Sequence, residues 1–171
     1  MCKLRTMRSM GELKGVSNHL RYEVNMLLSS ATGLASGVFG EKNTVANALL
    51  EAFVLHLRTI MEFLYPRGRR LKDDDVLASD FFDSAVQWCK IRDKQVGKEL
   101  RRSLENARDR ADKEMAHLTY SRLKVTSAEK GWPYIKIANE VRKAIRVFID
   151  NVPEEKLSTD WLKGPKQLEG C

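Results

Sequence analysis

The sequence predicts an all-α fold, an antiparallel up-down four-helix bundle with one extra short helix. Apolar residues recur at helical spacing over four long segments, and no segment shows the alternation typical of a strand. The 171 residues include only four prolines and ten glycines, too few for a barrel or sandwich with many tight turns. Helices that are apolar on one side bury that side in an antiparallel bundle.

The first predicted helix covers residues 17–35, with Ser17 as its N-cap. Residues 1–16 are expected to form a flexible basic arm. The bundle domain is predicted to span residues 17–152, and residues 153–171 to form a polar tail that Trp161 docks onto it. The apolar residues of the first helix fall on one face: Leu20, Val24, Leu27, Leu28, Ala31 and Leu34.

The second predicted helix, residues 44–65, carries the clearest pattern. Its apolar residues repeat at alternating steps of four and three, which is the spacing of an a/d seam. Asn43 or Thr44 is the expected N-cap, and Pro66 is expected to end the helix because proline lacks an N–H and clashes with the preceding turn. Residues 66–80 are then expected to form a charged linker. The seam residues are Ala46, Leu50, Phe53, Leu57, Ile60 and Leu64.

Three further helices are predicted after this linker. A short helix is expected over residues 79–91 and a long one over residues 98–123, with a break at Gly97 between them. The last helix is expected to open at Pro133, because the first turn of a helix tolerates proline, and to end near Val152.

Cysteine content and hydropathy argue against several classes of protein. No stretch approaches the roughly 18 uninterrupted apolar residues of a membrane span, and the first residues lack the apolar core of a secretory signal. The three cysteines, Cys2, Cys89 and Cys171, form no C-x-x-C pair, so we expect neither a disulfide framework nor a thiolate zinc site. The sequence therefore favours a cytoplasmic protein without a membrane partner, and we expect Cys89 to be buried as a small apolar residue.

Positive charge is concentrated in one part of the chain. The formal net charge is +7, and residues 90–124 hold eleven Lys or Arg against six Asp or Glu. A local surplus of this kind attracts polyanions, and we expect RNA as a partner.

The same segment contains an Arg/His pair with a spacing that suits RNA chemistry. Arg110 and His117 are seven residues apart, which places them on one helix face about 10.5 Å apart along the axis. Arginine offers a fork of donors to a phosphate, and histidine transfers protons near neutral pH. We therefore predict Arg110 and His117 as catalytic residues. Arg108, Lys113 and Tyr120 are predicted to bind RNA phosphates.

Two other interpretations of these residues remain open. Arg110 and Glu114 are four residues apart, a spacing that forms ion pairs on solvated helix faces. Glu114 and His117 also have the i, i+3 spacing of carboxylate-bridged di-metal bundles, but such a site needs two of these pairs and the chain has one. We therefore expect no metal and no other cofactor.

The arrangement resembles the HEPN superfamily, whose four-helix bundles carry an Arg-x(4–6)-His motif on the penultimate long helix. Here the motif is Arg110-ADKEMA-His117, with six residues between. The stretches NALLEAFVLHLRTIMEFLY and KEMAHLTYSR are also similar to a group of uncharacterised bacterial HEPN-like proteins. The resemblance covers residues 17–150.

This resemblance implies a metal-independent endoribonuclease of a bacterial toxin–antitoxin or anti-phage defence system. Members of the superfamily commonly form homodimers in which both chains contribute to one cleft, and some act with an antitoxin or another partner protein. Arg110 would then hold the scissile phosphate and stabilise its developing charge. His117 would act as general acid/base or orient the 2′-hydroxyl that attacks the phosphorus.

One position departs from the family pattern. Active members usually carry a polar residue directly after the arginine, whereas this chain has Ala111 there and Asp112 one position later. The departure favours an alternative, in which the domain is catalytically inactive and serves as an RNA-binding, protein-binding or dimerisation module.

Overall fold

A computed structural model describes residues 6–40, 43–67, 71–114 and 131–162 of the chain. Helix accounts for 76% of these residues, and none of them forms a strand. The predicted all-α class is therefore confirmed.

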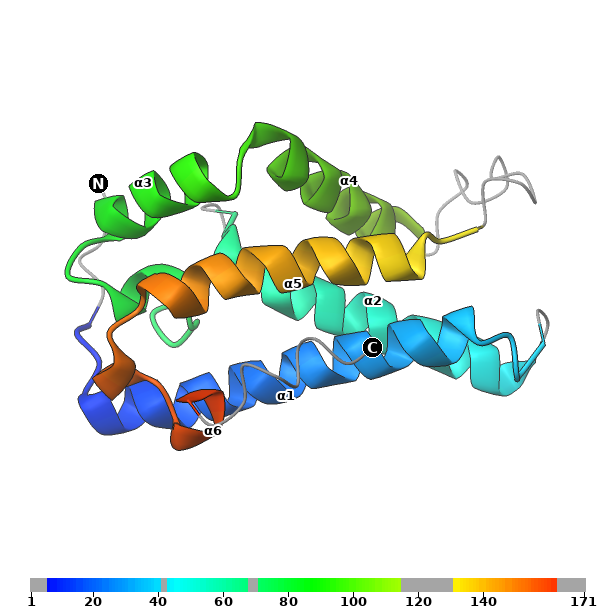
Figure 1. The fold of residues 1–171 in the computed structure, drawn as a ribbon, viewed down its shortest axis with the longest axis horizontal. Coiled ribbons are helices and arrows are strands. Elements are labelled where there is room, and N and C mark those ends of the chain that lie inside the picture. The colour runs from blue at the N-terminus through cyan, green and yellow to red at the C-terminus, as the bar shows by residue number, and fades with distance from the viewer. Residues whose placement is uncertain (1–5, 41–42, 68–70, 115–130, 163–171) are drawn as a thin grey trace.

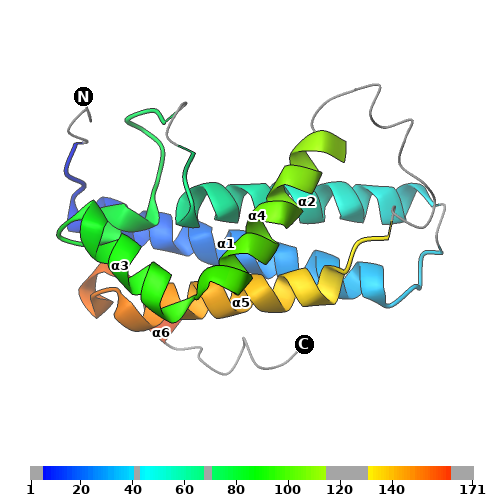
Figure 2. The same cartoon turned by 90° about the horizontal axis from the view of Figure 1, so that it is seen from above.

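Three long helices lie alongside one another and a helical pair lies across them (Figures 1 and 2). Helix α1 (Met10–Ala35) packs against both α2 (Thr44–Leu64) and α5 (Tyr134–Asn151). The pair consists of α3 (Ala85–Gln95) and α4 (Lys98–Glu114), and α4 crosses α5 and α2 obliquely in Figure 2. Because α4 is oblique, the structure does not confirm the finer prediction of an up-down four-helix bundle.

Helix α1 begins seven residues before the predicted start. Its N-cap is Ser9, whose hydroxyl accepts a hydrogen bond from the Glu12 backbone N–H (3.3 Å). The Glu12 carboxylate accepts one from the Ser9 backbone N–H in return (2.7 Å), and these hydrogen bonds hold the pKa of Glu12 below its usual value. Residues 10–16, predicted to belong to a flexible arm, are therefore helical.

Ser17 is a docking point for the C-terminal segment rather than an N-cap. Its side chain is buried and accepts a hydrogen bond from the Ser158 backbone N–H at 2.7 Å. The indole Nε1 of Trp161 donates to the Ser17 carbonyl at 2.6 Å. Trp161 belongs to the short helix α6 (Thr159–Leu162), which follows a 3₁₀ turn at Glu154–Lys156. The predicted docking by Trp161 is thus confirmed.

Helix α2 begins and ends as predicted. Asn43 caps it by accepting a hydrogen bond from the Val45 backbone N–H (2.8 Å), and it ends at Leu64, two residues before Pro66. By length and composition α2 could cross a membrane, but the core helix of a folded domain passes the same test. Its apolar face is buried against α1 and α4.

The predicted helix over residues 79–91 is divided into two elements. A 3₁₀ turn covers Ala78–Phe81, and α3 begins after Ser84, whose hydroxyl accepts a hydrogen bond from Gln87 N–H (3.3 Å). Within α3, Trp88 is buried but Cys89 is exposed, so the prediction of a buried Cys89 is wrong. The predicted break at Gly97 is confirmed, because its φ of +79° suits glycine and separates α3 from α4.

Phe148 of α5 stands at the centre of an aromatic cluster that joins α5 to α2, α3 and the 3₁₀ turn. Its ring is fully buried and meets four other aromatic rings, mostly edge to face. The centroid separations are 5.0 Å to Phe63, 5.2 Å to Phe81, 6.1 Å to Phe82 and 5.6 Å to Trp88.

Truncation of Phe148 is expected to destabilise the fold strongly. Phe148→Ala should lower the free energy of unfolding by about 3–5 kcal/mol, because it removes a buried ring and leaves a cavity between helices. Val86→Ala, at a position that is 59% exposed, should change it by less than about 0.5 kcal/mol. Urea unfolding of both variants measures the difference, and equal losses would contradict the central position of Phe148.

Candidate functional site

Three of the five predicted site residues lie in the C-terminal half of α4. Arg108, Arg110 and Lys113 belong to the described part of this helix, and Lys113 is exposed. His117 and Tyr120 lie outside the described residues. The site can therefore be built from the three cations and the residues around them.

Arg110 is held against the residues that lead into α5. Its guanidinium carbon lies 4.3 Å from the centroid of the Trp132 ring, and its Nη1 donates to the Gly131 carbonyl at 2.9 Å. Trp132 is itself buried, with its ring edge-on to Phe53 of α2 (6.2 Å between centroids). A guanidinium stacked on a fixed aromatic ring keeps its plane and its direction, which suits binding of a planar or tetrahedral anion.

Arg108 occupies the interior rather than the surface. Its side chain is 5% exposed, and its Nη1 donates to the Tyr65 carbonyl at 2.7 Å. The same nitrogen lies 3.5 Å from a carboxylate oxygen of Glu62. Burial lowers the pKa of Arg108, but a guanidinium remains protonated in proteins. The geometry therefore makes Arg108 a link between α4 and the end of α2, and this position does not suit the predicted phosphate contact.

Tyr65 is the partner that this link holds in place. Its ring is buried and lies close to two further guanidiniums, 5.1 Å from that of Arg92 and 5.6 Å from that of Arg101. Burial raises the pKa of Tyr65 to about 12, against a smaller opposing effect of the two arginines. Within the described residues its hydroxyl has no hydrogen-bond partner. Sequence reasoning did not identify this cluster, because its members come from α2, α3 and α4.

The carboxylates of α4 are engaged in ion pairs, mostly with arginines from outside the helix. Asp112 accepts from Arg58 at 2.7 Å and from Arg67 at 3.0 Å, and Arg67 also binds Asp109. Arg101 pairs with Glu105 at 2.9 Å in the same way. These contacts do not lower the local positive surplus, because the carboxylates are already subtracted in it and Arg58 and Arg67 come from outside the segment.

The residue after Arg110 faces the core. Ala111 is fully buried, and Asp112, the next polar residue, is engaged by two arginines. Neither residue therefore places an unengaged polar group beside Arg110.

The two described histidines are not part of this end of α4. His56 of α2 is buried, and its Nδ1 lies 2.7 Å from a carboxylate oxygen of Glu23 on α1, so it is a paired core histidine. His19 is exposed on α1. Among the residues that the structure places, no group of three or more His, Cys, Asp or Glu is arranged to hold a metal ion.

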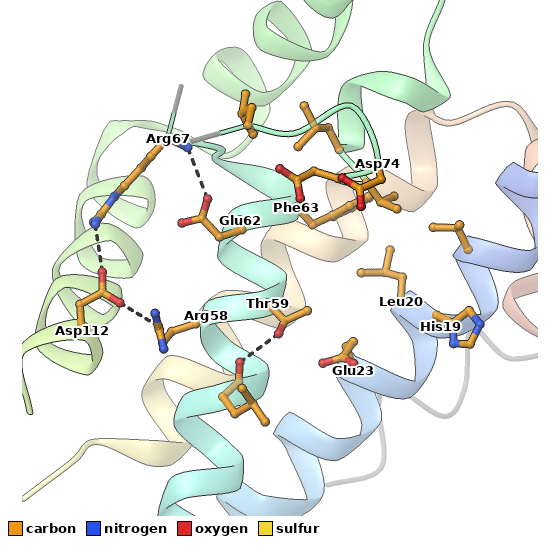
Figure 3. A pocket seen from close by; sticks show the side chains of 16 residues that line it. His19, Leu20, Glu23, Arg58, Thr59, Glu62, Phe63, Arg67, Asp74 and Asp112 are labelled. Carbon is orange, nitrogen blue, oxygen red and sulfur yellow. Dashed lines mark hydrogen bonds and ion pairs between the residues drawn. The ribbon is translucent and has the colours of Figure 1, made fainter. Parts of the chain in front are cut away.

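A groove of about 970 Å³ lies on another part of the surface (Figure 3). It runs between α1 and α2 and is closed on one side by residues 71–77. Asp112 of α4 and Arg67 stand at one end, and His19 of α1 at the other. The sequence patterns of α1 and α2 predict apolar faces, but they do not show which part of those faces stays uncovered.

Comparison with protein-family models, with curated proteins and with solved structures finds no match to this chain. The functional interpretation therefore rests on the geometry of Arg110 and of the groove, together with the sequence motif.

The ionisation of Tyr65 is expected to lower the free energy of unfolding at alkaline pH. Its pKa is about 12 in the folded protein and about 10 in an unfolded chain, so the unfolded state loses this proton first as the pH rises. The stability that the neutral hydroxyl contributes is complete below about pH 10 and falls by about 2–3 kcal/mol as the pH approaches 12.

Urea unfolding of the wild type and of Tyr65→Phe over this pH range measures the effect. The variant keeps the ring beside the two arginines and removes the ionisable group, so its stability should fall less steeply as the pH rises. Parallel pH profiles for the two proteins would show that Tyr65 does not carry the shifted pKa.

Proposed function

We propose that the protein is an HEPN-like helical-bundle domain that binds RNA at the C-terminal end of α4 and cleaves it without a metal ion. Arg110 is the phosphate anchor and His117 the proton-transfer residue. The observation that carries this proposal is the fixed guanidinium of Arg110, stacked on Trp132 and bonded to Gly131.

Chain connectivity supports the pairing of Arg110 with His117. The described part of α4 ends at Glu114, one helical turn after Arg110, and the described chain resumes at Gly131, which Arg110 contacts. His117 is three residues beyond Glu114, and three residues span at most about 11 Å when fully extended. This chain length is compatible with both side chains acting on one RNA strand, as the proposal requires.

The proposed reaction uses these two side chains together with a second acid/base group, which the other chain of a homodimer would supply. The 2′-hydroxyl attacks the adjacent phosphorus and loses its proton, the bond from phosphorus to the 5′-oxygen breaks, and the leaving oxygen gains a proton. His117 transfers one of these protons, and Arg110 stabilises the charge that develops on the phosphoryl oxygens. In a homodimer, the second chain would supply the other acid/base group to the same cleft.

A second candidate function is favoured by a specific observation, the burial of Ala111 and the double ion pair of Asp112. Without a polar neighbour, Arg110 would bind a phosphate but contribute less to catalysis. In that case the protein is an RNA- or protein-binding module of the same fold, of the kind that acts beside an antitoxin or another partner protein.

Cleavage of a labelled single-stranded RNA in EDTA tests the proposal. The wild type should cleave, and His117→Ala and Arg110→Ala should each lower the rate at least about 100-fold, because general acid/base catalysis contributes on that scale or more. Arg102→Ala is the matched control, since Arg102 is an exposed arginine of the same helix and should be replaceable without loss.

Binding measured on the same RNA separates the two candidate functions. The inactive binding module would be established if the wild type binds the RNA without cleaving it, and if this binding weakens with rising salt and in Arg110→Ala. If the wild type neither cleaves this RNA nor binds it in a salt-dependent way, both candidate functions are contradicted.

A further inference from the structure

The groove between α1 and α2 has the shape of a seat for a third helix. Its α1 side is formed by Val16, His19, Leu20 and Glu23, and its α2 side by Leu55, Arg58, Thr59 and Glu62. Each set follows the i, i+3, i+4, i+7 spacing of one helix face, so each wall is two turns, or about 10 Å, long. Side chains of a third helix could interdigitate with these two ridges along that length.

Apolar side chains line the groove and are incompletely covered. Leu20, Phe63 and Leu77 are buried at its base. Leu55 of α2 remains 58% exposed, and Val76, in the segment of residues 71–77, remains 38% exposed. Exposed apolar residues gathered in one concave surface are typical of an interaction site, whereas scattered ones are not.

The charge of the groove is opposite to that of the protein as a whole. Its described lining contains five carboxylates and two arginines, giving a formal charge of −3 with neutral histidine, in a chain of net charge +7. Phosphate groups would be repelled from this surface, and lysine and arginine side chains attracted to it. The groove therefore differs in its chemistry from the end of α4 that carries Arg110.

The negative charge is greatest away from α4. Arg58 and Arg67 both bind Asp112, so the end of the groove next to α4 is largely neutralised. Figure 3 shows Asp74 and Glu23 apart from this group of ion pairs. A ligand that lies along the groove thus meets apolar side chains over its whole length and carboxylates at the end distant from α4.

We propose that the groove binds a short, cationic, amphipathic helix of a partner protein. Apolar side chains at positions i, i+3 or i+4, and i+7 of that helix pack on Leu20, Leu55 and Val76. A lysine or arginine side chain beside this apolar stripe reaches Asp74, and Glu23, whose carboxylate also contacts His56 Nδ1 (2.7 Å), adds to the negative charge there. The occupant is a helix because the groove is formed by two helical ridges, and the described residues offer no sheet edge to which a strand could add.

A synthetic helical peptide with a leucine stripe and lysines on its flanks provides the probe. Its binding to the full chain, followed by fluorescence anisotropy in the absence of RNA, should give a dissociation constant in the micromolar range or below. A peptide of the same composition with the leucines scrambled, and one with the lysines replaced by glutamates, should each bind at least about ten-fold more weakly.

Variants of the protein assign the binding to the groove. Asp74→Lys and Leu55→Gln should each raise the dissociation constant about five-fold or more, and neither residue is buried, so the fold should be retained. Glu155→Lys and Val86→Gln are the matched controls, at an exposed carboxylate and an exposed apolar residue outside the groove, and should leave it unchanged.

Three results would overturn the proposal. Equal weakening by Asp74→Lys and Glu155→Lys would show general attraction of a cationic peptide to acidic residues. Equal binding of the leucine-stripe and scrambled peptides would show that the apolar lining is not used. If the wild type associates with itself and Leu55→Gln abolishes this association, the occupant of the groove is a second copy of this chain. None of these results depends on whether the protein cleaves RNA.

Discussion

The position of α4 depends on one buried cation, Arg108. Its guanidinium reaches from the middle of α4 to the Tyr65 carbonyl, just beyond the last turn of α2, where a helix leaves backbone carbonyls without intrahelical partners. A hydrogen bond from a charged donor contributes more than a neutral one, and a buried guanidinium that lost its acceptor would be costly. The arrangement therefore fixes how far along α2 the oblique helix α4 lies.

Two surfaces of opposite charge follow from this placement of α4. Arg110, two residues after Arg108, is brought to Trp132 and Gly131 at the start of α5. Asp112, two residues further, is brought to Arg58 and Arg67 at the edge of the groove. One short stretch of helix thus presents a cation, Arg110, to the proposed RNA site and an anion, Asp112, to one end of the groove. Asp112 binds Arg58 and Arg67 there, so these two arginines do not neutralise the carboxylates at the other end.

Local signals in the sequence were sufficient for α2, because the seam residues lie within the helix and Asn43 and Pro66 lie within two residues of its ends. The start of α1 was missed although Ser9 and Glu12 form the S-x-x-E pattern of a capping box, since few apolar residues follow them. The sequence also contains an indication that Arg108 is buried. It is four residues after Leu104 and three before Ala111, so it lies on the same helix face as these two buried residues. The stacking of Arg110 on Trp132, the Tyr65 cluster and the groove join segments distant in the chain, and helical periodicity carries no information about such pairings.

The most direct test of this account compares the stability of Arg108→Ala with that of Arg102→Ala by urea unfolding. If Arg108 is a structural link, its removal leaves the Tyr65 carbonyl without this donor and should lower the free energy of unfolding by about 2–4 kcal/mol. The exposed Arg102 should contribute less than about 0.5 kcal/mol. Unchanged stability of Arg108→Ala, combined with weakened RNA binding, would show that Arg108 acts on a phosphate and would contradict the account.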